Sequence, residues 1–569
     1  MEKDEKNIAS GIGECMLFWM TGIVVLTPIL FALGISISYI NVLFPLIMTA
    51  LLLFLSNQYS ISEKVIMLCI SIGTIIIIVL SCGAVFDQTW DGGAYHKTAV
   101  GLLKEGWNPL YNTAIEFNER SGILPFVGAN PIKYAEGYPK ASWYLAASIY
   151  YITGNIESGK AYTLIFAVIT CLIIYGYFRA KEYSVGKCIL LSLMAGFHPM
   201  VLAQMHSYYV DGMTGCILIM LMVESLMVAD QSRNCDKKRH YFIVGELVIF
   251  GCGLKFSTLG FTALICIITF LFQAYYSGSN MKFVAKLLAY YAGTAGFSIV
   301  VVGAAPYVTN IHRYRDIFYG FSNMMDPSVL EASFGIAGLG KTGRMFASLF
   351  GKMSHGSYQS LGELLKLPFT YDKSELDYYS FVDLRVSGSG MFFSGILLLS
   401  LAILAVMAVK GELKSASDKL MLCYLVCIAF ELIAFEETYQ IRYISHIYIV
   451  VIYAFELLWR KQELCNRCRK SGICVLSTVI TVFMCLNGLP WVKPAYDRID
   501  SSITYRYELE KLAAMNSGQK VTIAFWSYDF SGMHFNLADF GIRDYEFVDM
   551  SELTEINYTS IYGNWVMYY

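Results

Sequence analysis

Long stretches without a charged side chain open the sequence and set its dominant pattern. Residues 15–62 contain no Asp, Glu, Lys or Arg, which is enough for two membrane-spanning helices of about 20 residues each, joined by a turn near residues 36–41. A second uncharged stretch, residues 65–86, has the same spanning length. It begins too far from the N-terminus and is too long to be a cleaved signal peptide. We therefore expect three membrane-spanning helices before the first long polar segment.

Further apolar stretches of helical length continue through most of the chain. They are centred on residues 161–178, 188–205, 212–228, 241–254, 258–275, 287–304, 391–409, 420–435, 444–459 and 472–489. The fold class they predict is an all-α polytopic membrane protein with about thirteen transmembrane helices. Composition agrees, because 56% of the 569 residues are hydrophobic and 15% are charged, whereas a soluble domain carries about 25% charged residues.

Positive charge alternates between the short loops and orients the predicted helices. Lys and Arg cluster in the loops at residues 179–187, 233–239, 410–419 and 460–470. The short loops at 204–211 and 435–441 contain neither residue. By the positive-inside rule, the basic loops and the N-terminus lie in the cytoplasm. We expect a multi-pass protein of the cytoplasmic membrane.

An odd number of spans places three long segments outside, at residues 86–160, 305–390 and 490–569. None of the 15 cysteines falls in these segments, so disulfides are not part of the predicted design. We divide the chain into a membrane domain, residues 1–490, with outer loops 86–160 and 305–390, and an extracytoplasmic tail domain, residues 491–569. No basic arm or aromatic–basic stripe indicates nucleic-acid binding.

The outer segments differ in their patterns. In residues 94–106 the apolar positions share one helical face and Lys97 and Lys104 the other, which predicts a helix lying in the membrane interface. A second interfacial helix is expected before and within the Tyr-rich stretch 143–151. The loop 305–390 is rich in Gly, Ser and Met and predicts loops with short helices.

The tail domain alternates between helical and strand-like stretches. We expect helices at residues 503–515 and 531–540, and strands near residues 520–526 and 545–549. This order predicts a small α/β domain that rests on the membrane domain, because so short a chain buries too little apolar surface to be stable alone.

The first candidate for chemistry is Asp91, in the sequence Trp-Asp-Gly-Gly at the outer mouth of the third span. A carboxylate beside two glycines can be approached closely by a ligand and can act as general base on a hydroxyl or amine. The alternative is that Asp91 caps the helix at residues 94–106, where its oxygens would accept free N–H groups. Asp87, four residues earlier, is a second candidate for the base.

The second candidate is Asp211, in the tight outer turn that contains residues 198–212. An ionised carboxylate at this depth is energetically unfavourable unless it faces water or a partner, which favours a functional role for Asp211. The alternative is a turn Asp followed by Gly. Lys255 and Arg442 lie at the same predicted level, where a cation can meet a lipid phosphate or extend to the interface.

In order along the chain, these pieces resemble the GT-C superfamily of membrane glycosyltransferases, which use polyprenyl-phosphate sugars. The resemblance covers most of residues 86–445. It rests on Asp91, Tyr95-His96, Gly106-Trp107-Asn108-Pro109, Gln204, Tyr208-Tyr209, Asp211-Gly212, Leu254-Lys255-Phe256-Ser257, Pro306-Tyr307, Asn310, Asp383, Arg385, Gly388 and Arg442-Tyr443.

The resemblance implies a GT-C-like fold with an active site at the outer face and a polyprenyl-phosphate-linked sugar as donor. It implies that Asp91 is the catalytic base or binds the acceptor, and that Asp211 contacts acceptor, sugar or a metal. Lys255 and Arg442 would bind the donor phosphate. The other residues of the expected substrate-binding set are Tyr95, His96, His206, Tyr209, Arg385 and Tyr443.

The expected function is transfer of a sugar to a glycan, lipid or protein acceptor of the cell envelope, with inversion at the anomeric carbon as the resemblance implies. No cofactor is predicted, and a divalent metal stays open. The rival hypothesis is a transporter or flippase for a lipid-linked glycan, which would need charged residues deep in several spans and inverted repeats. The predicted charges gather at one face, which favours a reaction at the surface.

Overall fold

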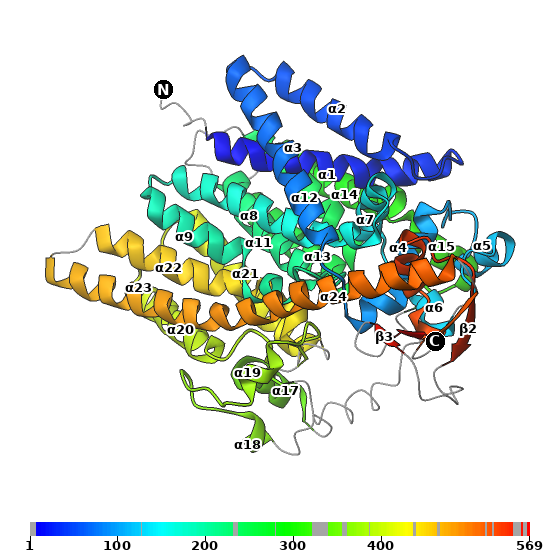
Figure 1. The fold of residues 1–569 in the computed structure, drawn as a ribbon. Coiled ribbons are helices and arrows are strands. Elements are labelled where there is room, and N and C mark those ends of the chain that lie inside the picture. The colour runs from blue at the N-terminus through cyan, green and yellow to red at the C-terminus, as the bar shows by residue number, and fades with distance from the viewer. Residues whose placement is uncertain are drawn as a thin grey trace.

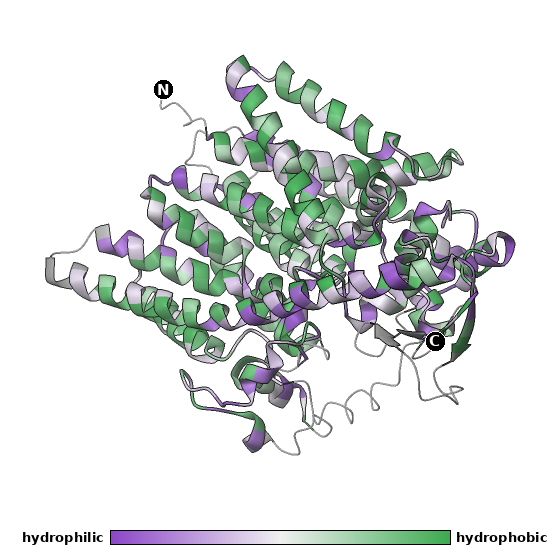
Figure 2. Cartoon of the chain, in the orientation of Figure 1, coloured by the Kyte–Doolittle hydropathy of each residue, from purple (hydrophilic) through white to green (hydrophobic). Residues whose placement is uncertain are grey.

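Helices follow the apolar stretches along most of the chain, and strands begin at residue 521 in the part that the structure describes. The computed structural model describes residues 7–126, 128–230, 237–278, 280–320, 339–354, 361–385, 387–435, 440–463, 467–517, 520–525, 528–549, 559–561 and 566–568. Apolar residues run along the helices, and polar residues gather at helix ends and in the connecting segments (Figure 2).

Eight helices in these described ranges are long and apolar enough to cross a membrane, counting the helical segments continuous with them. They contain α1 (Ile8–Ala32), α3 (Ile61–Gly83), α8 (Tyr162–Arg179), α11 (Asp211–Ala229), α13 (Phe256–Tyr276), α14 (Met281–Phe297), α22 (Tyr448–Glu463) and α23 (Arg467–Gly488). Such helices indicate a membrane protein.

Five more helices coincide with the remaining predicted spans. Three are apolar but shorter, namely α2 (Ile40–Leu55), α9 (Val185–Gly196) and α20 (Phe393–Val409). Two carry more charged residues, namely α12 (Lys237–Leu254) and α21 (Ala416–Ala434). Helix α9 ends early because the chain turns before Pro199 and resumes as α10 (Pro199–Gln204). The count of about thirteen spans stays a prediction.

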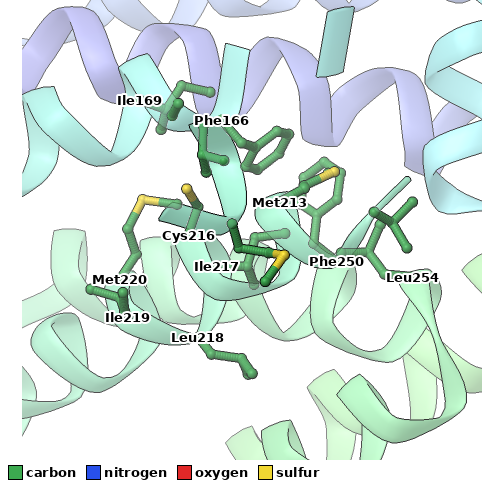
Figure 3. Packing of buried hydrophobic residues seen from close by; sticks show 14 of the residues in the cluster. Phe166, Ile169, Met213, Cys216, Ile217, Leu218, Ile219, Met220, Phe250 and Leu254 are labelled. Carbon is green, nitrogen blue, oxygen red and sulfur yellow. The ribbon is translucent and has the colours of Figure 1, made fainter. Parts of the chain in front are cut away.

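Helix α11 lies at the centre of the bundle, and all its residues are buried. A helix that is hydrophobic all round must be enclosed, and α8 and α12 pack against it. Figure 3 shows the contact, where Phe166 of α8 and Phe250 of α12 lie near Met213 and Ile217 of α11. The Phe166 and Phe250 rings meet edge to face at 4.7 Å. The first residue of this enclosed helix is Asp211, so the core holds that carboxylate in place.

The two predicted outer loops fold into short elements. Loop 86–160 contains η1 (Gly92–His96), α4 (Lys97–Lys104), α5 (Ala114–Ser121), α6 (Ala129–Gly137), α7 (Ala141–Thr153) and η2 (Ile156–Ala161). The later connections contain η3 (Ser298–Val302), η4 (Ala304–Val308), α15 (Thr309–Tyr314), α17 (Lys341–Phe350), α18 (Leu361–Leu364), α19 (Glu375–Tyr378), η6 (Ile441–Ile447) and η7 (Leu489–Trp491). Elements α4, α5, α6 and α15 gather with the strands at one end of the bundle (Figure 1).

The tail has the predicted mixture of helix and strand. It contains α24 (Val492–Asn516), β1 (Val521–Phe525), η8 (Tyr528–Phe530), α25 (Met533–Asp539), β2 (Tyr545–Asp549), β3 (Thr559–Ile561) and β4 (Val566–Tyr568). The sheet order is β2-β1-β4-β3. Strands β1 and β2 are parallel, with Val521 opposite Tyr545, and α25 lies in the crossover between them. The other two pairings are antiparallel.

The two helices expected in the membrane interface are instead buried. Lys97 of α4 was expected on the polar face, yet it is 0% exposed. Residues Ala141–Tyr150 of α7 are all buried. The interfacial interpretation was therefore wrong for these positions. The reason is tertiary, because the tail covers α4: the Phe535 ring of α25 packs where a side chain at Gly101 would point.

Candidate functional site

Asp91 opens a π-helical turn, η1, directly after the extended link that follows α3. Its carboxylate caps no backbone N–H group at the start of η1. Its side chain accepts one hydrogen bond, from the Tyr95 hydroxyl to Oδ2 at 3.1 Å, and is half-buried. The helix-cap alternative for Asp91 therefore has no support in this geometry. π-Helical turns of this kind are frequent at functional sites.

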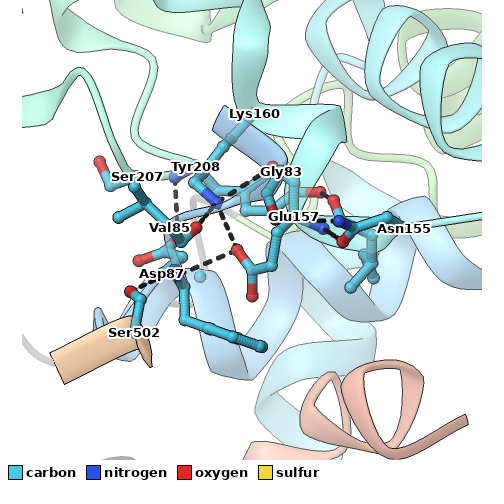
Figure 4. Close-up of polar contacts among 12 residues, drawn as sticks. Gly83, Val85, Asp87, Asn155, Glu157, Lys160, Ser207, Tyr208 and Ser502 are labelled. Atoms are coloured by element: carbon cyan, nitrogen blue, oxygen red, sulfur yellow. Dashed lines mark hydrogen bonds and ion pairs between the residues drawn. The ribbon is translucent and has the colours of Figure 1, made fainter. Parts of the chain in front are cut away.

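Asp87, the other candidate for the base, is held by the backbone. Its oxygens accept the N–H groups of Thr89 at 2.9 Å and Tyr208 at 2.8 Å, and its own N–H donates to Glu157 at 2.9 Å. Its residue is 1% exposed. Figure 4 shows Asp87 beside Glu157, which also pairs with Lys160 at 2.5 Å. Asp87 ties the loop to the bundle and is poorly placed to meet a substrate.

Asp211 is buried at the first turn of α11. It accepts hydrogen bonds from Lys255 Nζ at 2.9 Å and from Gln204 Nε2 at 3.0 Å. The backbone carbonyl of Asp211 accepts the Ser445 hydroxyl at 2.9 Å. A simple turn Asp needs no cation and no such set of partners. Asp211 is therefore more than an unpartnered turn residue, and its functional role stays a prediction.

Arg442, at the start of η6, connects two carboxylates. Its Nη1 lies 2.6 Å from Asp383 Oδ1 and 3.9 Å from Asp211 Oδ2. Its Nε donates to Gln440 at 2.9 Å, and its guanidinium stacks 5.3 Å from the Tyr209 ring. Arg442 is 8% exposed. Arg442 is therefore buried, and carboxylates from distant parts of the chain compensate its charge and hold it in place.

Two further cations at the site are more exposed. The Lys255 side chain is 24% exposed and lies 3.7 Å from the centre of the Tyr443 ring. The Arg385 side chain is 29% exposed and donates through Nε to Asp383 at 2.8 Å. We call Asp91, Asp211, Asp383, Lys255, Arg385 and Arg442 the charge cluster. It contains three carboxylates and three cations. The carboxylates offset the repulsion between the cations, which lets three cations lie together where an anion could bind.

The electrostatics of the charge cluster act on Asp91. Burial raises the pKa of the Asp91 carboxyl to about 6. The negative charge of Asp383 adds to the rise, whereas Arg442 and the hydrogen bond from Tyr95 oppose it. A carboxylate with a pKa near the working pH is a stronger base than an ordinary Asp and is still largely ionised at neutral pH.

Tyr95 and His96 lie in an aromatic group beside Asp91. His96 Nδ1 accepts the indole N–H of Trp143 at 2.7 Å, and its ring stacks on Tyr208. Burial lowers the pKa of His96 to about 3, so the imidazole is neutral. The Tyr95 ring lies 5.0 Å from the Tyr134 ring. His96 is buried at the end of η1, where its contacts with Trp143 and Tyr208 hold this turn against the bundle. A direct role in substrate binding stays a prediction.

The charges that act on His206 come from outside the charge cluster. Burial, followed by the charges of Lys160 and Arg498, lowers its pKa to about 4, so its charged neighbours belong to the group around Asp87. Three residues were missing from the expected site, namely Asp383, which belongs to the charge cluster, and Gln204 and Gln440, which contact it. Asp383 and Gln204 stood in the motifs, and the spacing Asp383-x-Arg385 was the available signal for an ion pair. No local signal identifies Gln440.

The tail packs directly on the segment that carries Asp91. Asn536 of α25 accepts from Lys97 Nζ at 2.9 Å and donates to Glu157 at 2.8 Å. Ser531 and Thr98 share a hydrogen bond at 2.9 Å. The Phe530 ring meets Trp90 edge to face at 6.2 Å. These contacts fix the position of the π-helical turn, and with it the direction of Asp91.

Within the described ranges, no group of three or more His, Cys, Asp or Glu side chains is arranged to hold a metal ion. A scan against protein-family models found no match, and a search of curated proteins found no similar sequence.

Proposed function

We propose that this protein is a membrane glycosyltransferase that moves a sugar from a polyprenyl-phosphate donor to a cell-envelope acceptor. The observation that carries the proposal is the position of Asp91. Its carboxylate is half-buried, caps no helix, and lies within Coulombic range of Arg442, Asp211 and Asp383. A base poised beside cations at one end of a membrane bundle suits attack by a hydroxyl on a lipid-linked, anionic leaving group.

In the proposed reaction, Asp91 accepts the proton of the acceptor hydroxyl as its oxygen attacks the anomeric carbon. The new glycosidic C–O bond forms while the C–O bond to the phosphate breaks, and the electron pair leaves with the polyprenyl phosphate. The growing negative charge on the phosphate is stabilised by the cations of the charge cluster. The reaction inverts the anomeric centre, because a single displacement occurs on the face opposite the leaving group.

The three cations have different roles in this proposal. Lys255 keeps two N–H donors beyond the one directed at Asp211, and its partial exposure makes it the first contact for the donor phosphate. Arg385 is the second. Arg442 is enclosed and engaged by Asp383, so it chiefly positions the carboxylates and contributes positive charge to the site.

The rival function, transport of a lipid-linked glycan, has one observation in its favour. Glu431 and His446 form a buried pair at 2.9 Å within the helical bundle, and both side chains are 1% exposed. Ionisable pairs at such depth occur in transport pathways. The charge cluster at one end of the bundle remains the stronger indication, because it gathers a base and three cations around a single site.

The proposal is tested by Asp91→Asn in proteoliposomes that contain a polyprenyl-phosphate sugar and a candidate acceptor. Asn keeps the size of Asp and the bond from Tyr95 but cannot take the proton, so we expect turnover to fall about 100- to 10,000-fold per folded molecule. Asp87→Asn is the matched control. It should reduce the amount of folded protein, because Asn has only one acceptor oxygen and leaves one of the two backbone N–H groups, of Thr89 or of Tyr208, facing an NH₂ group. It should spare turnover in the molecules that fold.

Two results would contradict the proposal. Normal transfer by Asp91→Asn together with lost transfer by folded Asp87→Asn would move the base by four residues. Normal transfer by both variants, with impaired movement of the lipid-linked glycan across the bilayer, would favour the transporter.

A further inference from the structure

Two half-buried tyrosines lie beside the segment that carries Asp91. Tyr134 belongs to α6 and Tyr138 caps its C-terminal end, and their ring centres are 5.5 Å apart. Both rings contact the Tyr95 ring, at 5.0 and 5.8 Å, and the Tyr95 hydroxyl donates to Asp91 Oδ2. We call the Tyr134 and Tyr138 rings the aromatic surface. A single ring, that of Tyr95, connects it to the carboxylate of the proposed base.

The aromatic surface also extends toward the cations of the site. The Tyr138 ring lies 6.3 Å from the ring of Phe256, the residue that follows Lys255. Tyr134 lies within Coulombic range of Tyr443, and the Tyr443 ring lies 3.7 Å from Lys255 Nζ. A ligand on the aromatic surface would therefore have the proposed base on one side and the expected donor phosphate on the other.

Two polar groups at the aromatic surface are available to a ligand. No hydrogen bond joins the Tyr134 hydroxyl to another described residue. Within the same part of the chain, Asp91 accepts only the bond from Tyr95 to its Oδ2, which leaves Oδ1 without a donor. A ligand that satisfies both groups must carry more than one hydrogen-bonding group around an apolar centre.

The charges near Tyr134 are negative. Burial, followed by the charges of Asp91 and Asp529, raises the pKa of the Tyr134 phenol, and no cation among the described residues acts on it. Asp529 lies in η8 of the tail, whose Phe530 ring packs against Trp90 at 6.2 Å. Carboxylates repel an anionic ligand, so the chemistry of this side of the site favours an uncharged one.

We propose that the aromatic surface and Asp91 form the acceptor subsite, and that the acceptor is a neutral saccharide. Its ring would lie on Tyr134 and Tyr138, with one hydroxyl donating to Asp91 Oδ1 and another paired with the Tyr134 hydroxyl. A sugar ring carries C–H groups on its faces, which the negative face of an aromatic ring attracts, and hydroxyls around its edge. This inference rests on the proposed transfer reaction and specifies its acceptor.

Other acceptor classes fit these groups less well. A lipid alcohol has one hydroxyl and would leave either Asp91 Oδ1 or the Tyr134 hydroxyl without a partner. A peptide brings backbone N–H and C=O groups, which lose their bonds to water against aromatic rings. A phosphorylated or carboxylated glycan would bring negative charge toward Asp91 and Asp529.

The test measures transfer in proteoliposomes from one polyprenyl-phosphate sugar to four classes of acceptor. These are neutral hexose and pentose oligosaccharides, uronic-acid oligosaccharides, peptides that contain Ser and Thr, and long-chain alcohols. We expect the highest kcat/KM with a neutral oligosaccharide. A higher kcat/KM with any of the other three classes would overturn the inference and leave the proposed transferase in place. The absence of transfer to all four classes would refute the transferase itself, and the inference with it.

Variants of Tyr134 test the subsite. Tyr134→Phe keeps the ring and the packing but loses one neutral hydrogen bond, so the Michaelis constant for the oligosaccharide should rise roughly 2- to 10-fold. Tyr134→Leu also loses the stacking and should raise it roughly 5- to 100-fold. The Michaelis constant for the lipid donor should stay at the wild-type value in both variants, which general damage to the fold would not allow.

The matched control is Tyr507→Leu, which changes a tyrosine that is 64% exposed on α24 of the same outer region. It should leave both Michaelis constants unchanged. If Tyr134→Leu binds the oligosaccharide as well as Tyr507→Leu does, the aromatic surface is not the acceptor subsite. A rise of the donor constant alone in Tyr134→Leu would also overturn the inference, because it would assign the aromatic surface to the donor.

Discussion

The contact between the tail and the membrane domain makes a prediction that can be worked out from the structure. Asn536 accepts a hydrogen bond from the buried Lys97 and donates one to the buried Glu157, at 2.9 and 2.8 Å. Asn536→Leu keeps a similar volume and removes both bonds. Each hydrogen bond to a charged group contributes about 1.5–3 kcal/mol. Lys97 and Glu157 still pair with each other at 2.6 Å in the variant. We therefore expect the free energy that holds the tail in place to fall by about 3 kcal/mol, the lower limit for two such bonds.

This loss should act on the docking of the tail and leave the helical bundle folded. Since about 1.4 kcal/mol corresponds to a tenfold change in an equilibrium constant, local opening of α25 should become roughly 100-fold more frequent. Amide hydrogen exchange of α25 and β1, followed by mass spectrometry of the purified protein, measures this opening directly. Exchange in α11, at the centre of the bundle, should stay at the wild-type rate.

Two variants serve as controls. Ser531→Ala removes one neutral hydrogen bond to Thr98 and should speed α25 exchange only about 5-fold, for about 1 kcal/mol. Lys493→Ala, on the exposed surface of α24, should have no effect. If Asn536→Leu exchanges like Lys493→Ala, the buried network does not hold the tail, and our account of how Asp91 is positioned is refuted.

Three further predictions concern topology and the site. Cysteine reporters at Asn118 and Ser517 should react with an impermeant thiol reagent in intact cells and one at Ser415 should not; the reverse pattern would invert the map and remove the outer site. With a pKa of about 6 for Asp91, transfer should be flat above that pH and fall about tenfold per unit below it, as protonation removes the base; a flat profile down to pH 4 would exclude Asp91 as the base. Lys255→Ala should raise the Michaelis constant for the lipid donor roughly 10- to 150-fold, the equivalent of a charge-assisted contact of about 1.5–3 kcal/mol; unchanged donor kinetics would place the phosphate elsewhere, with Arg385 the next residue to change.

Much of the helical framework could be predicted from local patterns. Apolar stretches of spanning length mark helices because backbone N–H and C=O groups in lipid must be satisfied within the segment itself. The same local reasoning located the α/β order of the tail, where β1 and β2 flank α25. Residues Asp91, Asp211, Lys255 and Arg442 were chosen one by one from their predicted depth. The structure brings all four into the charge cluster.

The partners of buried polar groups could not be predicted in this way. Asp87 and Asp91 are four residues apart, and in the sequence either could be the base. In the structure, backbone N–H groups donate to the Asp87 carboxylate, whereas the Asp91 carboxylate caps no helix. The sequence predicted that Lys97 faces solvent, whereas in the structure it is buried against Asn536 of the tail. Each outcome depends on a group from a distant part of the chain.

Hydropathy and charge along the chain therefore determined the class of the protein, the positions of its helices and the residue types available for chemistry, since burial in lipid acts on each segment separately. Tertiary structure alone decided which carboxylates are engaged and which cations are enclosed. The physical reason is that a buried charge or hydrogen-bonding group must find a partner in space, and sequence distance does not specify that partner.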